Sequence, residues 1–275
     1  MTRLRHAGCV FAEDEARLLL DAAGSGDDLD DMVERRVAGE PLEQVLGWAE
    51  FCGLRITVQP GVFVPRRRTQ LLVRQALALL RHGDSRTPPV PARPRVVVDL
   101  CCGSAAVGAA ILAGAPAVEL YAADVDPAAV RCARRNVPGE RVHEGDLYEA
   151  LPASLAGRVD ILVVNAPYVP TDDIPLMPPE ARLHEARLAL DGGPDGVDVQ
   201  RRVVAGAARW LVPGGHLLVE TSARQVPRTV QAFTDHGFVT TVARSRALSA
   251  TVVIGTPAAD ARHRPGRSTA GGPPA

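Results

Sequence analysis

The sequence predicts an α/β protein whose main domain is a mostly parallel sheet covered by helices, and three patterns support this. Residues 95–100 include three successive valines and Leu100, as expected for a parallel strand buried on both faces. Strand and helix patterns then alternate along the chain, which is typical of βαβ units. Near the end, residues 237–243 and 249–255 form two successive strands that are expected to pair as an antiparallel hairpin.

Upstream of this domain the chain is expected to form helices and one hairpin. Residues 11–38 alternate apolar and charged positions at helical spacing, with a turn at Gly24-Ser25-Gly26. Residues 51–59 alternate strictly between apolar and polar, which predicts a half-buried strand that pairs with residues 46–50. A helix over 68–82 follows, and then a proline-rich linker to residue 94.

Downstream of the apolar run that ends at Val164, the segment 169–185 contains four prolines and is expected to be a long functional or mobile loop. A helix at 199–211, a strand at 215–221 and a helix at 224–234 precede the late hairpin. The segment after residue 256 is rich in Pro, Gly, Arg and Ala, a composition typical of disorder. We therefore expect four regions: a small helical region (1–45), a hairpin, helix and linker (46–94), the main domain (95–256) and a disordered tail (257–275).

Composition indicates a cytoplasmic protein that uses no metal. Apolar residues make up 46% of the 275 residues, and no segment is long enough to span a membrane. The five cysteines lack paired Cys-x-x-Cys spacing, and the arginines near the N-terminus precede no apolar core of a signal peptide. A net charge of −1 argues against stable binding to nucleic acid. We expect a monomer or a weak dimer.

Polar residues stand at the ends of four successive strands, and their order is the main functional signal. They are Asp99, Asp124, Asp146 and Asn165. In an open α/β sheet, ligands bind at the carboxyl ends of the strands. Any one of these acids could simply cap a helix, but four at successive strand ends predict a ligand site. Asp124 at the second strand end is suited to accept the two hydroxyls of a ribose.

The tetrapeptide Asn165-Ala166-Pro167-Tyr168 indicates what the site acts on. It places an amide oxygen, a backbone carbonyl and an aromatic ring together at the end of the fourth strand. Two acceptors beside a flat ring suit a planar group that ends in NH2, either a carboxamide or the exocyclic amine of a nucleobase. The alternative is a strand that ends in an ordinary Asn-Pro type turn.

The order of these motifs resembles that of the class I S-adenosylmethionine-dependent methyltransferases. Within that class it is similar to the protein-(glutamine-N5) methyltransferases of the HemK/PrmC family, over about residues 13–255. The segments that carry the likeness are Gly39-Glu40-Pro41, Leu46 to Phe51, Phe63-Val64-Pro65-Arg66, the four strand ends, and Leu183 to Gly193. The resemblance implies a Rossmann-like domain with a seven-stranded, mostly parallel sheet, preceded by a small helical domain and a β-hairpin.

The chain departs from the family pattern at several positions of the expected site. Ala166 replaces the first proline of Asn-Pro-Pro-Tyr, and Cys101 and Ala105 replace glycines of the cofactor loop. Arg67 and Arg68 stand where the family has Pro and an acid, and Gln70 stands where it has Glu. The N-terminal region is also short. These departures indicate a side branch whose acceptor need not be a release factor.

The resemblance implies S-adenosylmethionine as the cofactor and assigns roles to residues of this sequence. The methionine ammonium is expected at Asp99 and the ribose at Asp124. The catalytic group would comprise Asn165, Ala166, Pro167 and Tyr168, and the substrate would contact Asn165, Tyr168 and Glu185. The cofactor-binding set would be Pro65, Arg66, Asp99, Cys101, Gly103, Asp124, Val125, Asp146, Leu147 and Asn165.

Three functions follow from this interpretation. The first is methylation of a glutamine side-chain amide in a protein, such as the Gly-Gly-Gln loop of a peptide-chain release factor. The second is methylation of adenine N6 in a nucleic acid, which the charge does not favour. The third is methylation of a small molecule of secondary metabolism, which the departures at 67–70 and 166 favour.

Overall fold

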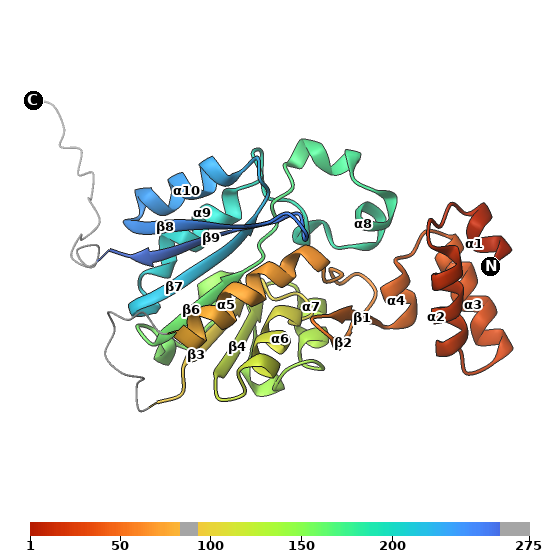
Figure 1. The fold of residues 1–275 in the computed structure, drawn as a ribbon, viewed down its shortest axis with the longest axis horizontal. Coiled ribbons are helices and arrows are strands. Elements are labelled where there is room, and N and C mark those ends of the chain that lie inside the picture. The colour runs from red at the N-terminus through yellow and green to blue at the C-terminus, as the bar shows by residue number, and fades with distance from the viewer. Residues whose placement is uncertain (83–92, 259–275) are drawn as a thin grey trace, which may run out of the picture.

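The computed structural model of the protein describes residues 1–82 and 93–258 (Figure 1). The expected linker falls mainly at 83–92, and most of the expected tail at 259–275, so both lie outside the described residues. Strand β9 continues to Pro257, one residue into the expected tail. The helices are α1 (Thr2–His6), α2 (Ala12–Ala22), α3 (Gly26–Val37), α4 (Leu42–Leu46), α5 (Gln70–His82), α6 (Ala106–Gly114), α7 (Pro127–Ala133), α8 (Pro179–His184), α9 (Asp198–Ala207) and α10 (Val226–Asp235).

The strands form two sheets. A two-stranded antiparallel sheet pairs β1 (Trp48–Phe51) with β2 (Leu54–Thr57), which confirms the expected hairpin. The main sheet has seven strands in the order β5-β4-β3-β6-β7-β9-β8. They are β3 (Val96–Leu100), β4 (Glu119–Asp124), β5 (Val142–Glu144), β6 (Val159–Val164), β7 (Leu211–Thr221), β8 (Phe238–Ser245) and β9 (Ala250–Pro257).

The connections of the main sheet confirm a mostly parallel architecture with one antiparallel edge. Strands β5, β4, β3, β6 and β7 run parallel, while β9 pairs antiparallel with both β7 and β8. The expected late hairpin is therefore present. The strand order reverses direction at β3, because β4 and β5 lie on one side of it and β6 on the other. In such sheets this switch point is where ligands bind.

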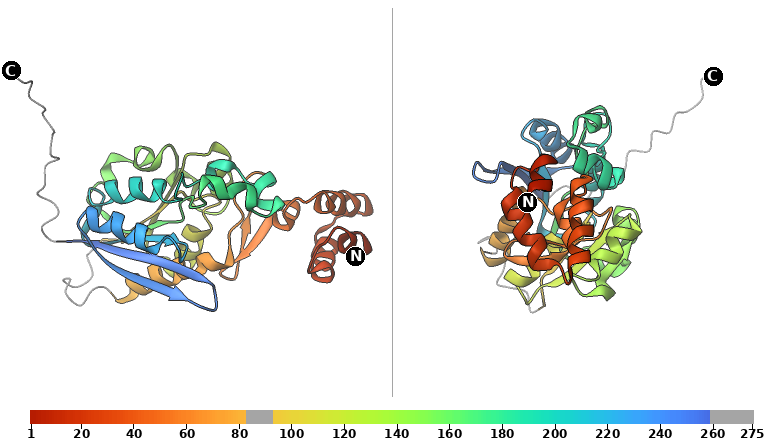
Figure 2. Two further views of the ribbon diagram at one scale, coloured as in Figure 1. Left: turned by 90° about the horizontal axis from the view of Figure 1, so that it is seen from above. Right: turned by 90° about the vertical axis from the view of Figure 1, so that its right-hand side faces the viewer.

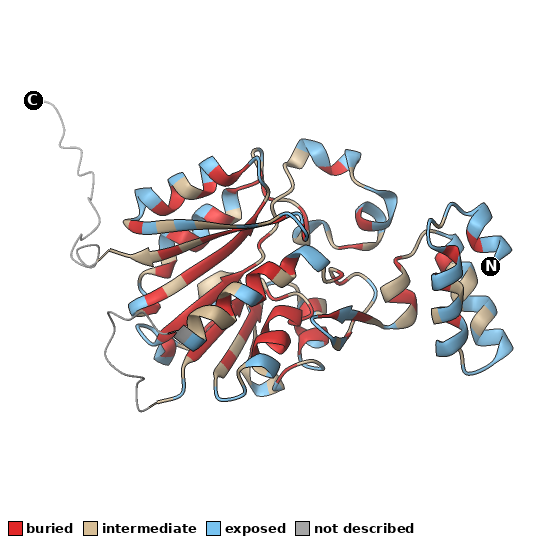
Figure 3. Cartoon of the chain, in the orientation of Figure 1, coloured by how far each residue is buried: buried red, intermediate tan, exposed pale blue. Residues whose placement is uncertain are grey.

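Helices cover both faces of the main sheet, and the two cores lie between them and the strands. Buried residues of α5, α6 and α7 pack on one face, and those of α9 and α10 on the other. All six residues of β6 are buried, and so are all five of β3, which explains why their sequences are apolar except for Asp160 and Asp99. Figure 3 shows this buried interior, with the exposed positions on the outer helix faces.

The first four helices form a separate small unit with a core of its own. Leu4, Ala12, Leu19 and Val45 are buried at its centre. In the left view of Figure 2 the red helices of this unit lie at one end of the molecule. The side chain of Arg36 in α3 pairs with Glu15 of α2 (2.7 Å) and also with Glu180 of α8 (2.7 Å), so it joins this unit to the main domain.

The segment 169–185 is more ordered than its prolines suggested. It contains a 3₁₀ helix at Thr171–Leu176 and helix α8 at Pro179–His184. Proline at the first position of a helix lacks only an N–H that the helix does not use, so Pro179 begins α8 and does not break it. In the described part of the chain no helix combines the length and apolar character needed to span a membrane.

Candidate functional site

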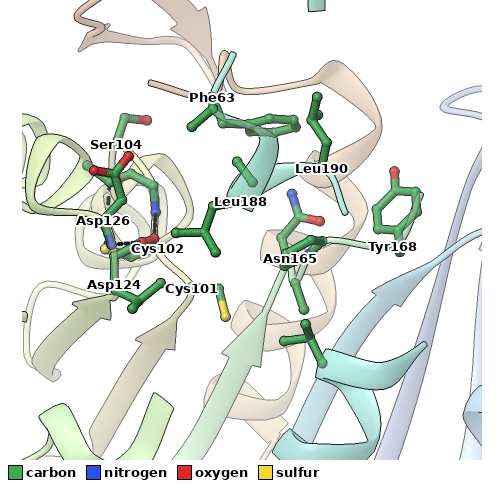
Figure 4. A pocket seen from close by; sticks show the side chains of 18 of the residues that line it. Phe63, Cys101, Cys102, Ser104, Asp124, Asp126, Asn165, Tyr168, Leu188 and Leu190 are labelled. Carbon is green, nitrogen blue, oxygen red and sulfur yellow. Dashed lines mark hydrogen bonds between the residues drawn. The ribbon is translucent and has the colours of Figure 1, made fainter. Parts of the chain in front are cut away.

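The site is a cavity at the carboxyl ends of β3, β4 and β6, at the switch point of the sheet. It encloses about 330 Å³, which falls within the range of small-molecule sites. Figure 4 shows Phe63 and Leu190 on one side of it, Cys101 on the opposite side, and Asp124 and Tyr168 at its two ends. The predicted residues that line it are Pro65, Arg66, Asp99, Cys101, Gly103, Asp124, Val125, Asp146, Leu147, Asn165, Ala166, Pro167 and Tyr168.

Asp124 organises the loop that follows β3. Its Oδ2 accepts a hydrogen bond from the N–H of Gly103 (2.8 Å), and its Oδ1 accepts one from the N–H of Asp126 (2.9 Å). Each carboxylate oxygen keeps further capacity to accept a bond from a ligand. Burial raises the pKa of Asp124, and the backbone donors oppose that rise. Asp126 in turn caps α7 through the N–H of Ala128.

The loop at 101–105 keeps a glycine-type backbone although it has lost two of the expected glycines. Cys101, Gly103 and Ala105 have φ values of 58°, 55° and 57°, in the left-handed region. For a residue with a Cβ this conformation costs about 1–2 kcal/mol. Cys101 and Ala105 therefore hold a backbone that suits glycine, at a cost in stability.

We expect Ala105→Gly to raise the free energy of unfolding by about 0.5–1 kcal/mol. Glycine removes the backbone strain of the left-handed conformation, but part of this gain is offset because glycine has more conformational freedom in the unfolded chain. The matched control is Ala109→Gly in the regular part of α6, which should lower stability by about 1 kcal/mol. Urea unfolding of both variants measures the difference. A loss of stability in Ala105→Gly equal to that of the control would contradict the strain argument.

Asp99 is the most deeply buried acid of the site. Only 2% of the residue is exposed, and its Oδ2 accepts the N–H of Gly108 in α6 (2.8 Å). The space is tight, since a Cβ on Gly108 would lie 3.1 Å from the same oxygen. Burial raises the pKa of Asp99 to about 8, the Gly108 N–H opposes the rise and the nearby Asp124 adds to it. A cationic ligand at this point would hold the carboxylate in its charged form.

We expect Asp99→Asn to stabilise the ligand-free protein at alkaline pH. The folded protein holds the Asp99 proton up to about pH 8, whereas the unfolded chain loses it near pH 4. The contribution of Asp99 to the free energy of unfolding therefore declines as pH rises from about 4 to about 8. Asparagine keeps the acceptor for Gly108 and does not titrate, so its Tm should match wild type at pH 4 and exceed it by at least about 4 °C at pH 8.5. Equal Tm values at both pH values in differential scanning calorimetry would show that Asp99 is not held neutral.

Asp146 lies at the cavity edge in a less protected position than the other two acids. Its Oδ2 pairs with Arg202 of α9 (2.5 Å), and both side chains are about half exposed. Arg202 also lines the cavity. The other carboxylate oxygen remains free to accept a hydrogen bond from a ligand.

Asn165 and Ala166 present the two acceptors that their sequence predicted. Figure 4 shows the Asn165 amide inside the cavity, between Leu188 and Tyr168. Within residues 1–82 and 93–258, neither this amide nor the Ala166 carbonyl has an intramolecular hydrogen-bond partner. Polar groups in a partly buried site usually find partners. Free acceptors at this position are therefore suited to a ligand.

The loop after Asn165 is held rigidly. Gln225 donates a hydrogen bond to the carbonyl of Tyr168 (2.8 Å). The N–H of Val169 donates to the carbonyl of Leu190 (3.0 Å), and the carbonyl of Val169 accepts a bond from the N–H of Gly192 (2.9 Å). Gly196 has a φ of 75°, and a Cβ there would lie 2.5 Å from the Tyr168 carbonyl oxygen. Burial first, and then Glu220, raises the pKa of Tyr168 to about 12, so its phenol is neutral at physiological pH.

Glu185 lies behind the cavity wall, which differs from the expected contact with substrate. Its Oε1 accepts hydrogen bonds from the N–H of Val64 (3.1 Å) and from Arg66 (2.6 Å). The carboxylate is buried and is absent from the cavity lining. Glu185 therefore braces the segment Phe63 to Arg66, which lies over the cavity.

Several lining residues were not singled out as site residues by the sequence. Phe63, Leu188 and Leu190 supply apolar walls. Glu220 does not line this cavity, but it was also missed: it is 2% exposed at the end of β7, with its Oε1 3.5 Å from both the Tyr168 hydroxyl and Arg68 Nε. An acid within the apolar run Leu217-Leu218-Val219-Glu220 is an observable signal for this position.

Comparisons with known proteins bear on what this cavity does. A family model described as "Methyltransferase small domain" matches residues 54–196. A release factor glutamine methyltransferase from Geobacter sulfurreducens is 38% identical over 211 residues, which cover 75% of this chain and 69% of that protein. The chain belongs to this methyltransferase family. It is therefore an enzyme of the class that uses S-adenosylmethionine, as the resemblance implied.

Two further likenesses help to define the enzyme. A 4-amino-L-phenylalanine/4-methylamino-L-phenylalanine methyltransferase from Streptomyces pristinaespiralis is 38% identical over 196 residues, which cover 70% of the enzyme and 65% of that relative, just under two thirds. A solved methyltransferase structure from Pyrococcus furiosus has a TM-score of 0.53 at 15% identity, covering 82% of the enzyme and 98% of that chain. The latter supports the fold alone.

Proposed function

We propose that the enzyme transfers a methyl group from S-adenosylmethionine to a planar NH2 group, and that the leading acceptor is the side-chain amide of a glutamine in a protein. The observation that carries this proposal is the pair of unpartnered acceptors at Asn165 and Ala166. Two acceptors on adjacent residues match the two N–H bonds of a primary amide.

The chain's own residues fit the cofactor. Asp124 would accept the ribose hydroxyls while it holds Gly103, and Asp99 would pair with the methionine ammonium. Asp146 and Leu147 would lie beside the adenine, and Phe63 to Arg66 would cover the nucleoside. The left-handed turn at 101–105 lets a ligand approach the backbone closely. When bound, S-adenosylmethionine supplies a methyl group already activated by its sulfonium.

The protein's part in the reaction is then to prepare the nucleophile. The nitrogen lone pair of a carboxamide is delocalised into its carbonyl, so the nitrogen attacks poorly. The Asn165 Oδ1 and the Ala166 carbonyl would accept both N–H bonds, direct the nitrogen towards the methyl carbon and stabilise the positive charge that develops on it. The methylated nitrogen is acidic enough to release one proton to water. Tyr168, which is neutral, would pack against the planar group.

The relative from Geobacter sulfurreducens is named for release factor glutamine methylation, and this supports a protein glutamine as the acceptor. The test incubates the enzyme with radiolabelled S-adenosylmethionine and a release factor, alongside the same factor with its Gly-Gly-Gln glutamine changed to alanine. Label that appears only on the unchanged factor supports the proposal. Equal labelling of both factors, or of neither, contradicts it.

A second acceptor class, a small aromatic amine, is favoured by a specific observation at Arg68. This residue stands where the family has an acid, and its guanidinium lies 5.6 Å from the centre of the Tyr168 ring. The side of the cavity next to Tyr168 therefore carries a positive charge where the family has a negative one. The relative named for 4-amino-L-phenylalanine is consistent with such an acceptor, whose reactive group is also a planar NH2.

The proposal includes a cytoplasmic enzyme that acts without a metal. All five cysteines are free, as is usual in a reducing compartment. Among the described residues no group of three or more His, Cys, Asp or Glu side chains is arranged to hold a metal ion.

A further inference from the structure

A second cavity adjoins the first on the side away from the cofactor residues. It encloses about 360 Å³ and shares two residues, Arg68 and Tyr168, with the first cavity. Asp99, Asp124 and Asp146 line only the first cavity. The second cavity therefore extends the acceptor side of the site. Its remaining lining is Glu220, Thr221, Ser222, Ala223, Arg244, Ser245, Arg246, Ser249, Ala250 and Thr251.

The charges of this cavity do not balance. Its one lining acid, Glu220, is already engaged by Arg68, with 3.5 Å between Arg68 Nε and Glu220 Oε1. Arg244 and Arg246 come from the end of β8 and the turn that follows it, and within residues 1–82 and 93–258 neither has an acidic partner. Two uncompensated guanidinium groups in a concave site attract an anion.

The neutral groups of the cavity suit an anion as well. Hydroxyl side chains at 245, 249 and 251 line the cavity together with the two arginines, whereas the Ser222 hydroxyl donates to Gln225 Oε1 (2.6 Å). Hydroxyls can donate to an oxyanion, and arginine binds carboxylates with paired N–H bonds. The nearby Glu220 disfavours a dianion by repulsion, so a group with a single negative charge fits better.

We propose that the second cavity holds a carboxylate of the methyl acceptor through Arg244 and Arg246, while the NH2 to be methylated lies at Asn165. This inference rests on the proposed function for the position of the NH2 group. The acceptor then spans the Tyr168 ring, with its reactive end in the first cavity and its anionic end in the second. The carboxylate belongs either to a free amino acid or to a peptide.

Two matched pairs of probes distinguish these sources. The first pair is 4-amino-L-phenylalanine and 4-aminophenethylamine, which differ only in the carboxylate. The second pair is acetyl-Gly-Gly-Gln-Gly with a free carboxyl end and the same peptide as an amide. Binding of each is measured by calorimetry with S-adenosylhomocysteine present, so no turnover is needed. The variants are wild type, Arg244→Ala/Arg246→Ala, and Arg131→Ala as an exposed arginine on α7 that lines neither cavity.

In at least one pair we expect the carboxylate member to bind about tenfold more tightly or better, the scale of charge-assisted hydrogen bonds. The double variant should abolish this preference, Arg131→Ala should keep it, and added salt should reduce it because both arginines are exposed. The pair that shows the preference identifies the source of the carboxylate.

Equal affinities within both pairs, a preference that survives the double variant, or no binding of either carboxylate probe would each overturn the proposal. Its failure is distinguishable from failure of the proposed function, which depends on Asn165. Methyl transfer that requires Asn165 while no probe shows a carboxylate preference would retain the function and remove only the second subsite.

Discussion

Asn165→Ala is expected to lower methyl transfer about a hundredfold while cofactor affinity stays within a few-fold of wild type. A loss of this size is typical when one preorganised polar group is removed from the position where charge develops. The cofactor should be unaffected because its proposed contacts are the acids of β3, β4 and the loop after β5. Rapid-quench single-turnover assays measure the transfer, and calorimetry measures the affinity.

Two companion variants separate the acceptor role of Asn165 from a structural one. Asn165→Asp should keep partial activity, since a carboxylate oxygen can accept the same hydrogen bond. Ala166→Pro should be tolerated or improve activity, because the carbonyl remains and, within the described residues, the Ala166 N–H donates no hydrogen bond that proline would remove. Full turnover in Asn165→Ala would reduce the tetrapeptide to a turn and remove the basis of the proposed mechanism.

The arrangement of the main domain could be predicted from sequence because its signals are local. The apolar runs 96–98 of β3 and 161–164 of β6 are buried on both faces, and the polar residue that follows each run, Asp99 or Asn165, marks the sheet edge. Since parallel strands all end at one edge, successive strand ends predict a shared cavity. Asp99, Asp124 and Asn165 all line that cavity.

The parts that could not be predicted depend on contacts between residues distant in sequence. The hydrogen bonds by which Glu185 holds the segment Phe63 to Arg66 could not be predicted, because its partners Val64 and Arg66 lie about 120 residues away in sequence. Likewise, the pairing of Asp146 with Arg202 joins residues 56 positions apart. The helices within 169–185 were missed for a different reason: three of their four prolines stand at helix starts and Pro175 lies inside the 3₁₀ helix, which composition alone does not distinguish from loop positions.

The rigid loop around Asn165 has a similar origin in distant contacts. The Gln225 side chain bonds to the carbonyls of Tyr168, Asp195 and Gly196, so one amide joins three segments at the site. Preorganisation of this kind keeps the acceptors in place before an acceptor molecule binds. It also explains why the replacement of proline by Ala166 can leave the direction of the carbonyl unchanged. The remaining Pro167 restrains Ala166 to an extended backbone.

Asp124→Ala is expected to weaken cofactor binding about tenfold or more. The lost bonds to the ribose hydroxyls are charge-assisted, and each is worth about 1.5–3 kcal/mol. The same substitution also removes the acceptor for the N–H groups of Gly103 and Asp126, so a loss of affinity could arise from a disordered loop. The calorimetry must therefore distinguish loss of a direct contact between Asp124 and the ribose from loss of the hydrogen bonds by which Asp124 holds the loop.

A double comparison makes that distinction. S-adenosylhomocysteine and its 2′-deoxy analogue are titrated into wild type, Asp124→Ala and Asp124→Asn. If Asp124 contacts the ribose, Asp124→Ala should cost much less affinity for the deoxy analogue than for the parent ligand, a coupling that loop disorder alone does not produce. Asp124→Asn should fall between the other two proteins, because it keeps one oxygen acceptor. Equal losses for both ligands would assign Asp124 to the support of Gly103 and leave the ribose hydroxyl at position 2′ to another partner.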